Sequence, residues 1–177
     1  QFYYWYMMKD VFSRKVVASE VHVAESSSLA AALLKRGTLK ERVLEVLILH
    51  SDNGSAMKGS TMLATMQNLG VVPSFSRPRV SNDNAFAETL FRTAKYCPTW
   101  PSKPFESLEK AREWVDGFVN WYNGEHRHSG IRFVTPEERH CGKAEELLRR
   151  RHQVYLAAKQ KHPRRWTGNT RNWTIRN

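Results

Sequence analysis

The strongest constraint in this sequence is an apolar run that stops abruptly at a short polar motif. Six of the seven residues at positions 43–49 are large and apolar, and HSDNG follows at positions 50–54. The length and composition of the run predict a buried strand. Open α/β sheets place their chemistry at the carboxyl ends of such strands, so Asp52 becomes a candidate functional residue.

A second polar stretch, residues 76–95, reads SRPRVSNDNAFAETLFRTAK and predicts a loop followed by a helix that carries Glu88. Thirty-five residues separate Asp52 from Glu88. Spacing alone leaves two interpretations open. In the structural one, Asp52 caps a helix that begins near Met57, and Glu88 pairs with Arg92 on the next turn. In the functional one, the two carboxylates hold a divalent cation.

The pattern along the rest of the chain predicts an α/β domain with an antiparallel hairpin beside a short parallel part. Gly37 is expected to end the first helix, and Pro73 is expected to mark an edge strand. The last fifteen residues have no period and are expected to be loosely held. The expected elements are strands at 1–13 and 16–23, a helix at 26–36, the strand before HSDNG, a helix at 57–68, a strand at 71–75, the Glu88 helix, and helices that begin near 107, 135 and 144.

The net charge of the chain points to an anionic partner. The formal charge is +11 and the sequence pI is near 10.0. Residues 141–177 hold ten Lys or Arg and two Glu, so this segment alone carries +8. A basic balance of this size predicts a nucleic acid first among anionic partners.

Cations also surround the second candidate acid. Glu88, Arg92 and Lys95 recur at i, i+4 and i+7 and therefore share one face of the predicted helix. Arg77 and Arg79 lie in the preceding loop, and their guanidinium groups suit bidentate contact with phosphate. In the functional interpretation the acids hold the ion and these cations hold the DNA backbone.

Two features bear on the cellular setting. Cys97 and Cys141 make neither a disulfide framework nor a metal spacing, which fits a reducing cytosol. The apolar run at 2–8 stops at Lys9 and Asp10 and is too short for a signal sequence or a membrane span. We therefore expect a cytoplasmic chain with no membrane partner. Because it begins with Gln, we also expect a piece of a longer protein.

Several motifs together resemble the insertion-sequence transposases of the DDE type, whose integrase catalytic core is related to retroviral integrases. HSDNG at 50–54, SRPRVSNDNAFAE at 76–88 and FRTAKY at 91–96 resemble their catalytic core. The segments at 105–123, 126–142 and 171–173 resemble their C-terminal half, so the likeness extends over essentially the whole chain. It implies a ribonuclease-H-like mixed sheet flanked by helices, followed by C-terminal helices and a basic tail.

The resemblance also implies an activity and its residues. Asp52 and Glu88 match the second and third acids of the family's Asp-Asp-Glu triad, and Lys95 matches a basic residue that contacts DNA. With Asn53, Arg77, Arg79 and Arg92, Lys95 is expected to bind DNA. The implied chemistry is DNA strand cleavage and joining by phosphoryl transfer with two Mg²⁺ or Mn²⁺ ions. The implied partners are double-stranded DNA at the ends and target of a mobile element, and further copies of the chain. The setting would be a bacterial cytoplasm, at the nucleoid.

The sequence departs from the family pattern at its beginning. The family's first acid lies on a central strand before the hairpin, and this chain starts after that point. Asp10 is the one acid before Glu20, and we expect it to close a strand into its turn. We therefore expect an incomplete core at 1–123, a helical extension with a basic tail at 124–177, and a chain that is poorly stable or inactive alone. The alternatives are a non-catalytic DNA-binding remnant and a ribonuclease-H-like nuclease that does not transpose DNA.

Overall fold

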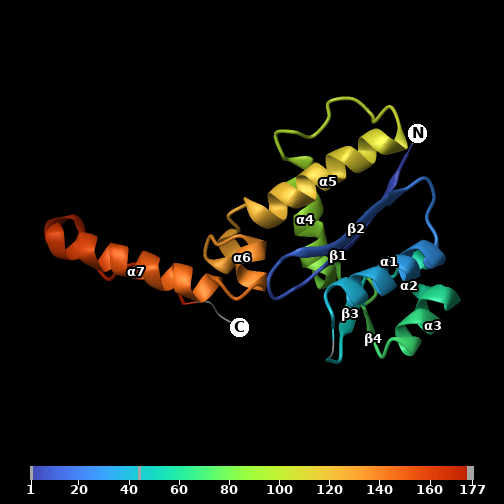
Figure 1. Cartoon of the computed structure of the whole chain (residues 1–177), viewed down its shortest axis with the longest axis horizontal. Coiled ribbons are helices and arrows are strands. Elements are labelled where there is room, and N and C mark those ends of the chain that lie inside the picture. Colours follow the sequence, from blue (N-terminus) through green and yellow to red (C-terminus); the bar gives the residue numbers. More distant parts are fainter. Residues whose placement is uncertain (1, 44, 175–177) are drawn as a thin grey trace. The chain divides into compact units, whose positions relative to one another are not determined.

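A computed structural model describes residues 2–43 and 45–174 of the chain, whose elements are labelled in Figure 1. The chain divides into two compact units. The first comprises residues 1–9 and 16–118, and the second comprises residues 10–15 and 119–177. Helix α5 (Leu108–Gly124) crosses this division, and the tip of the N-terminal hairpin belongs to the second unit. The domains predicted at 1–123 and 124–177 stay a prediction.

The first unit contains two small sheets. Strands β1 (Tyr4–Lys9) and β2 (Val16–His22) pair antiparallel, as the sequence predicted for the hairpin. Strands β3 (Ile48–Ser51) and β4 (Val72–Phe75) pair parallel, from Ile48 opposite Val72 to Ser51 opposite Phe75. The crossover between β3 and β4 runs through α2 (Ser55–Lys58) and α3 (Ser60–Asn68). No strand within the described ranges joins the two pairs.

Strand β3 is shorter and more exposed than the sequence predicted. It covers only Ile48–Ser51, and Val46 and Ile48 are 78% and 65% exposed. Leu47 and Leu49 pack against the core instead. The apolar run therefore alternates between two faces, and only one face is covered. The prediction of a buried strand was wrong because a continuous apolar run does not show how many layers pack on it.

The core of the first unit lies between the helices and one face of the strands. Helix α1 (Ser27–Lys40) contributes Ala30, Ala31 and Leu34, and α3 contributes Met62 and Met66. The side chain of Ser26 caps the first turn of α1 by accepting a hydrogen bond from the backbone N–H of Ser28, so the expected N-cap region is confirmed.

Gly37 lies inside α1 and does not end it, contrary to the sequence prediction. A Cβ atom at this position would lie 3.2 Å from the Cβ of Ala18 on β2. The absent side chain therefore allows α1 to approach the hairpin closely. Packing, and not termination, accounts for this glycine.

Helix α4 (Ala85–Lys95) is held against the N-terminal hairpin by an aromatic contact. Its Phe91 ring meets the Trp5 ring edge-on, with centroids 5.4 Å apart, and Trp5 also contacts Phe118 of α5. Lys9 Nζ donates to the carbonyl of Phe86 at the start of α4. Leu90 of the same helix is fully buried. These contacts fix the helix that presents Glu88.

The second unit is organised around α6 (Pro136–His140) and α7 (Ala144–Lys161), with short 3-10 turns at Ser129–Ile131 and Pro163–Arg165. Thr135 caps α6 through a capping box with Glu138, and Pro136 takes the first helical position, as predicted. Trp173 is only 8% exposed and packs with Ile131, Val134, Ala144 and Leu148. The expectation of a loosely held tail is therefore wrong at this residue.

The hairpin tip is closed by Asp10, as the sequence indicated. Its carboxylate accepts hydrogen bonds from the backbone N–H groups of Phe12 and Ser13 and from the Ser13 hydroxyl. His140 Nδ1 lies 3.4 Å from the same carboxylate. Burial by itself would raise the pKa of Asp10, but these hydrogen bonds hold it below its usual value.

One finding concerns membranes. Within residues 2–43 and 45–174, no helix has both the length and the apolar character needed to cross a bilayer.

We predict that Gly37→Leu destabilises the first unit. The added side chain meets Ala18, and overpacking of this kind costs about 1–3 kcal/mol. Gly117→Leu is the matched control, because Gly117 also lies inside a helix but has no neighbouring atom within 4 Å. The control should gain up to about 1 kcal/mol from helix propensity. Thermal melting followed by circular dichroism compares the two variants with the wild type. A higher melting temperature for both variants than for the wild type would contradict this role of Gly37.

The second prediction concerns acid stability. Because the pKa of Asp10 is lowered in the folded state, its contribution is present above the unfolded pKa of about 3.9 and is lost as the pH falls through the folded pKa. Asp10→Asn should therefore lower the free energy of unfolding at pH 7 by roughly 1 kcal/mol. The variant should also lose less stability than the wild type as the pH falls below about 4. Asp116→Asn, at an exposed acid of α5, serves as the control. If the melting temperatures of wild type and Asp10→Asn changed with pH in the same way, Asp10 would not be the group responsible for the loss of stability in acid.

Candidate active site

Asp52 immediately follows β3, so the predicted position at the carboxyl end of a strand is confirmed. Its Oδ1 accepts a hydrogen bond of 3.0 Å from the backbone N–H of Gly54, which is the N-cap of α2. The helix begins at Ser55, before the predicted Met57, and no side chain caps it directly. Asp52 thus closes a local turn through one oxygen. Its other oxygen has no hydrogen-bond partner among the described residues.

Glu88 lies in the first turn of α4, where the helix dipole favours a negative charge. Its side chain is exposed and forms no ion pair within the described part of the chain. The expected pair with Arg92 is absent, because the Arg92 guanidinium lies 5.9 Å from the centre of the Tyr96 ring instead. The structural interpretation of Glu88 was therefore wrong. No described cation neutralises this carboxylate by direct contact.

The two candidate acids line one cavity of about 470 Å³. The loop after β4 and the start of α4 supply most of the remaining wall. Arg92 and Lys95 do not line this cavity, although the sequence grouped them with Glu88; they lie one and two turns further along α4. The lining comprises Asp52, Asn53, Ser76, Arg77, Arg79, Val80, Asn84, Ala87, Glu88 and Phe91.

Hydrogen bonds between the ends of β3 and β4 fix the floor of this cavity. The backbone N–H of Ser76 donates to the carbonyl of Ser51 at 2.9 Å. Asn53 Nδ2 donates to the carbonyl of Ser76 at 2.8 Å. His50 Nδ1 lies 2.9 Å from the hydroxyl of Ser74. Asn53, a predicted DNA-binding residue, therefore has a structural bond that holds the two strand ends together.

Arg77 is already engaged by an acid of its own loop. Its Nε and Nη2 donate to the two carboxylate oxygens of Asp83 at 2.9 and 2.8 Å, and its backbone N–H donates at 2.8 Å. These bonds lower the pKa of Asp83 to about 2. Arg79 is exposed and has a positive φ of 64°, which is uncommon for a residue with a side chain. The sequence had singled out neither Asp83 nor the wall residues Ser76 and Asn84.

The donor set fits a hard divalent cation. Asp52 and Glu88 are exposed carboxylates without a contacting cation among the described residues, and Asn53 and Asn84 line the same cavity. Oxygen donors without thiolates are what Mg²⁺ and Mn²⁺ require. The described residues contain no cluster of three or more His, Cys, Asp or Glu side chains that could hold a metal. The carboxylate pair could therefore make up only part of a coordination shell.

Solved structures with the same fold include two integrases. The chain matches simian T-cell lymphotropic virus intasome, solved in complex with PP2A regulatory subunit B56 gamma, with a TM-score of 0.60 and 17% identity, over 78% of this chain and 48% of that one. It matches the catalytic core domain of BIV integrase with a TM-score of 0.54 and 18% identity, over 80% of this chain and 88% of that one. These likenesses confirm the predicted ribonuclease-H-like fold.

Related sequences include insertion-sequence transposases. The transposase of element IS904 from Lactococcus lactis is 28% identical over 130 residues, covering 73% of this chain and 51% of that protein. The putative transposase of IS986/IS6110 from Mycobacterium tuberculosis is 25% identical over 142 residues, covering 77% and 51%. The chain thus spans about half the length of these relatives.

The family follows from the domain patterns together with these relatives. One pattern described as the integrase core domain matches residues 1–81, and a second with the same description matches residues 69–136. Together they extend from the hairpin through both candidate acids to the start of α6. The chain belongs to the integrase-core family of DDE-type insertion-sequence transposases, which is related to the retroviral integrases.

Proposed function

We propose that this chain acts in DNA transposition, with Asp52 and Glu88 as carboxylates of a metal-dependent phosphoryl-transfer site. Membership of the family implies DNA transposition or integration. The observation that carries the proposal is that both acids line one cavity and that neither contacts a described cation. An unpaired carboxylate pair that lines one cavity with Arg77 and Arg79 suits a phosphate-bound metal better than it suits a purely structural role.

Each side chain then has a defined task. Asp52 and Glu88 would hold Mg²⁺ or Mn²⁺, and two ions would supply Lewis-acid stabilisation of charge on the phosphoryl oxygens. Arg79 lines the cavity and is free to contact a non-bridging phosphate oxygen. Arg92 and Lys95 lie further along α4 and would contact the DNA backbone away from the reacting group. Asn53 would hold the strand ends in place through its bond to Ser76.

We also propose a partner, an oligomeric state and a cellular location for the protein. The partner is double-stranded DNA, at the mobile-element ends and at the target. Because two ends must be joined in transposition, we propose a homo-oligomer in the complete assembly. We propose that the protein works in the bacterial cytoplasm, in association with the nucleoid.

A second function, DNA binding without catalysis, is favoured by the charge of residues 141–177, which hold ten Lys or Arg against two Glu. The two functions differ in whether the carboxylate pair binds a metal ion. A metal-dependent strand-transfer assay measures a separate quantity, the activity of residues 1–177 by themselves. With only two described carboxylates in the cavity, we expect no measurable product from this chain. Strand transfer above the level of an Asp52→Asn variant would contradict that expectation.

Metal binding by the carboxylate pair is the direct test of the proposed site. We predict weak binding of Mn²⁺, with a dissociation constant of about 10⁻³ M, as in exposed oxygen sites with few ligands. Asp52→Asn and Glu88→Gln should each abolish this binding in a titration followed by electron paramagnetic resonance. If both acids hold the same ion, the double variant loses no more than either single variant.

Glu113→Gln is the control, because Glu113 is an exposed acid of α5 outside the cavity. It removes the same charge and should leave Mn²⁺ binding unchanged. Equal losses in Glu113→Gln and Glu88→Gln would show that the ion responds only to net charge, and the proposed site would fail.

Arg77 provides a prediction for DNA affinity. Asp83→Asn removes the carboxylate that accepts two hydrogen bonds from the Arg77 guanidinium, so that a DNA phosphate can take its place. We expect tighter binding to duplex DNA, by about threefold at 0.15 M salt, and a salt slope steeper by about 0.9 for one additional phosphate contact. Fluorescence anisotropy at several salt concentrations measures both quantities.

The matched control for this experiment is again Glu113→Gln, which releases Lys110 from an ion pair outside the cavity. The net charge changes by the same amount in both variants, so a general electrostatic effect would be equal in the two. Weaker DNA binding by Asp83→Asn would mean that the bound pair holds the loop in its DNA-binding conformation.

A further inference from the structure

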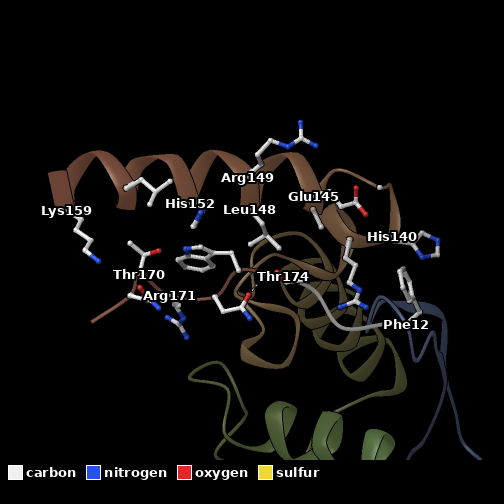
Figure 2. Close-up of a pocket in the computed structure, with 17 residues that line it drawn as sticks. Phe12, His140, Glu145, Leu148, Arg149, His152, Lys159, Thr170, Arg171 and Thr174 are labelled. Atoms are coloured by element: carbon white, nitrogen blue, oxygen red, sulfur yellow. Dashed lines mark hydrogen bonds between the residues drawn. The ribbon is translucent and has the colours of Figure 1, made fainter. Parts of the chain in front are cut away.

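The second unit contains a larger cavity that plays no part in the proposed catalytic site. Its volume is about 880 Å³, within the usual range for ligand pockets. Figure 2 shows it between α7 and the C-terminal segment, with Phe12 and His140 at one end and Lys159 at the other. The α7 residues that line it run from Ala144 to Lys159, a length of about 22 Å at 1.5 Å per residue. We call this elongated cavity the α7 groove.

The α7 groove is strongly basic. Among the residues that the structure describes, its wall contains one acidic side chain, Glu145, and two histidines, His140 and His152. Lys159 extends from α7 toward the segment that carries Thr170 and Arg171 (Figure 2) and donates to the carbonyl of Gly168 at 2.9 Å. Four residues with side chains that are cationic at neutral pH also line the groove, although the Arg149 side chain points away from it (Figure 2); they are Arg139, Arg149, Lys159 and Arg171.

Arg139 is the most informative of these cations. It is only 7% exposed, yet its guanidinium has no ion pair and no hydrogen bond within the described residues. It lies 4.2 Å from the centre of the Phe12 ring. Burial lowers the pKa of Arg139, Arg14 lowers it further, and Asp10 raises it. Its buried Nε lacks a hydrogen-bond partner among the described residues, so an anion seated at this position would satisfy it.

The nearby acid does not meet this need. The carboxylate oxygens of Asp10 accept hydrogen bonds from Phe12 and Ser13, and His140 Nδ1 lies beside them. Glu137 is paired with Lys15 at 2.9 Å. An anion from solution would therefore complete the contacts of Arg139 without displacing either acid from its partners.

We propose that the α7 groove binds a single strand of DNA. An elongated basic groove with aromatic side chains in its wall is the general arrangement for binding single strands, in which cations follow the backbone and bases stack on rings. Phe12 is 55% exposed at the Arg139 end and is the candidate stacking side chain; Trp173 also lines the groove but is only 8% exposed. A rigid duplex keeps its phosphates on a convex surface, whereas a flexible strand can follow the groove to Arg139, a residue that is only 7% exposed.

The inference rests on the proposed function only in taking DNA as the partner. Binding to the groove is measured without added metal, so its result does not depend on whether Asp52 and Glu88 hold an ion. The probe is a fluorescein-labelled oligothymidine of about 12 nucleotides, within the site sizes of such grooves. A hairpin duplex of similar length is the comparison, and anisotropy at about 0.15 M salt gives both affinities.

The principal variants are Lys159→Gln and Lys161→Gln. Both remove one charge from the last turn of α7, but only Lys159 lines the groove. We expect Lys159→Gln to weaken binding of the single strand by about fivefold and to reduce the salt slope by about 0.7, the value for one phosphate of a single strand. Lys161→Gln should change the affinity by less than about twofold, and neither variant should weaken duplex binding by more than that. Equal losses for both lysines, or equal losses for strand and duplex, would overturn the proposal.

Arg139→Met and Phe12→Leu test the buried end. Arg139→Met should weaken single-strand binding by about tenfold while the melting temperature stays constant or rises, because an unpaired buried charge is removed. Phe12→Leu should weaken binding by about fivefold at an unchanged salt slope, since it removes a stacking surface and no charge. A lower melting temperature together with unchanged binding in Arg139→Met would assign Arg139 a structural role. If either variant fails to fold, the two lysine variants decide the question.

Competition identifies the ligand. Thymidine monophosphate should displace the oligonucleotide only at concentrations at least about a hundredfold higher, because it offers one phosphate and one base. An acidic peptide of twelve glutamates should compete no better. Displacement by the mononucleotide at equal concentration would make this a free-nucleotide site, and displacement by the peptide would make it a general polyanion site; either result contradicts the proposal.

Discussion

Parallel pairing of β3 with β4 is the constraint on which the candidate active site depends. Each strand has only four residues, yet their parallel register brings both carboxyl ends to the same edge. Asp52 follows the end of β3, and Ser76 follows the end of β4. The hydrogen bond from Asn53 to the carbonyl of Ser76 connects the two strand ends, and the loop that begins at Ser76 leads into α4. Without that register, Glu88 would have no fixed relation to Asp52.

Local chemistry explains what the sequence could predict. An acid after an apolar strand, a helix that carries Glu88, and the capping signals at Ser26 and Thr135 are all visible over a few residues, and the structure contains each of them. Pro73 lies in a strand with one described neighbour, as expected for a residue that cannot donate to a ladder. The assignment of the family rested on several such segments in a fixed order.

Contacts between distant segments explain what could not be predicted. Gly37 stays helical because Ala18 lies against it, and no local signal announces that neighbour. Ile48 is exposed because only one face of β3 is covered. Trp173 comes from a segment without periodicity, yet it packs on α7. Arg92 shares a helical face with Glu88 in the sequence but turns to Tyr96 in the structure. Helical spacing shows which residues share a face and leaves their partners open.

The pair between Arg77 and Asp83 has a consequence for how the protein discriminates among anions. With the Asp83 pKa at about 2, the carboxylate stays charged at any physiological pH and remains available to Arg77. An anion that binds the Arg77 guanidinium must therefore replace this carboxylate. An incoming group must offer two oxygens in the geometry that Asp83 already provides. A monodentate anion such as chloride offers only one of the two contacts, so competition with Asp83 favours anions that bind through two oxygens.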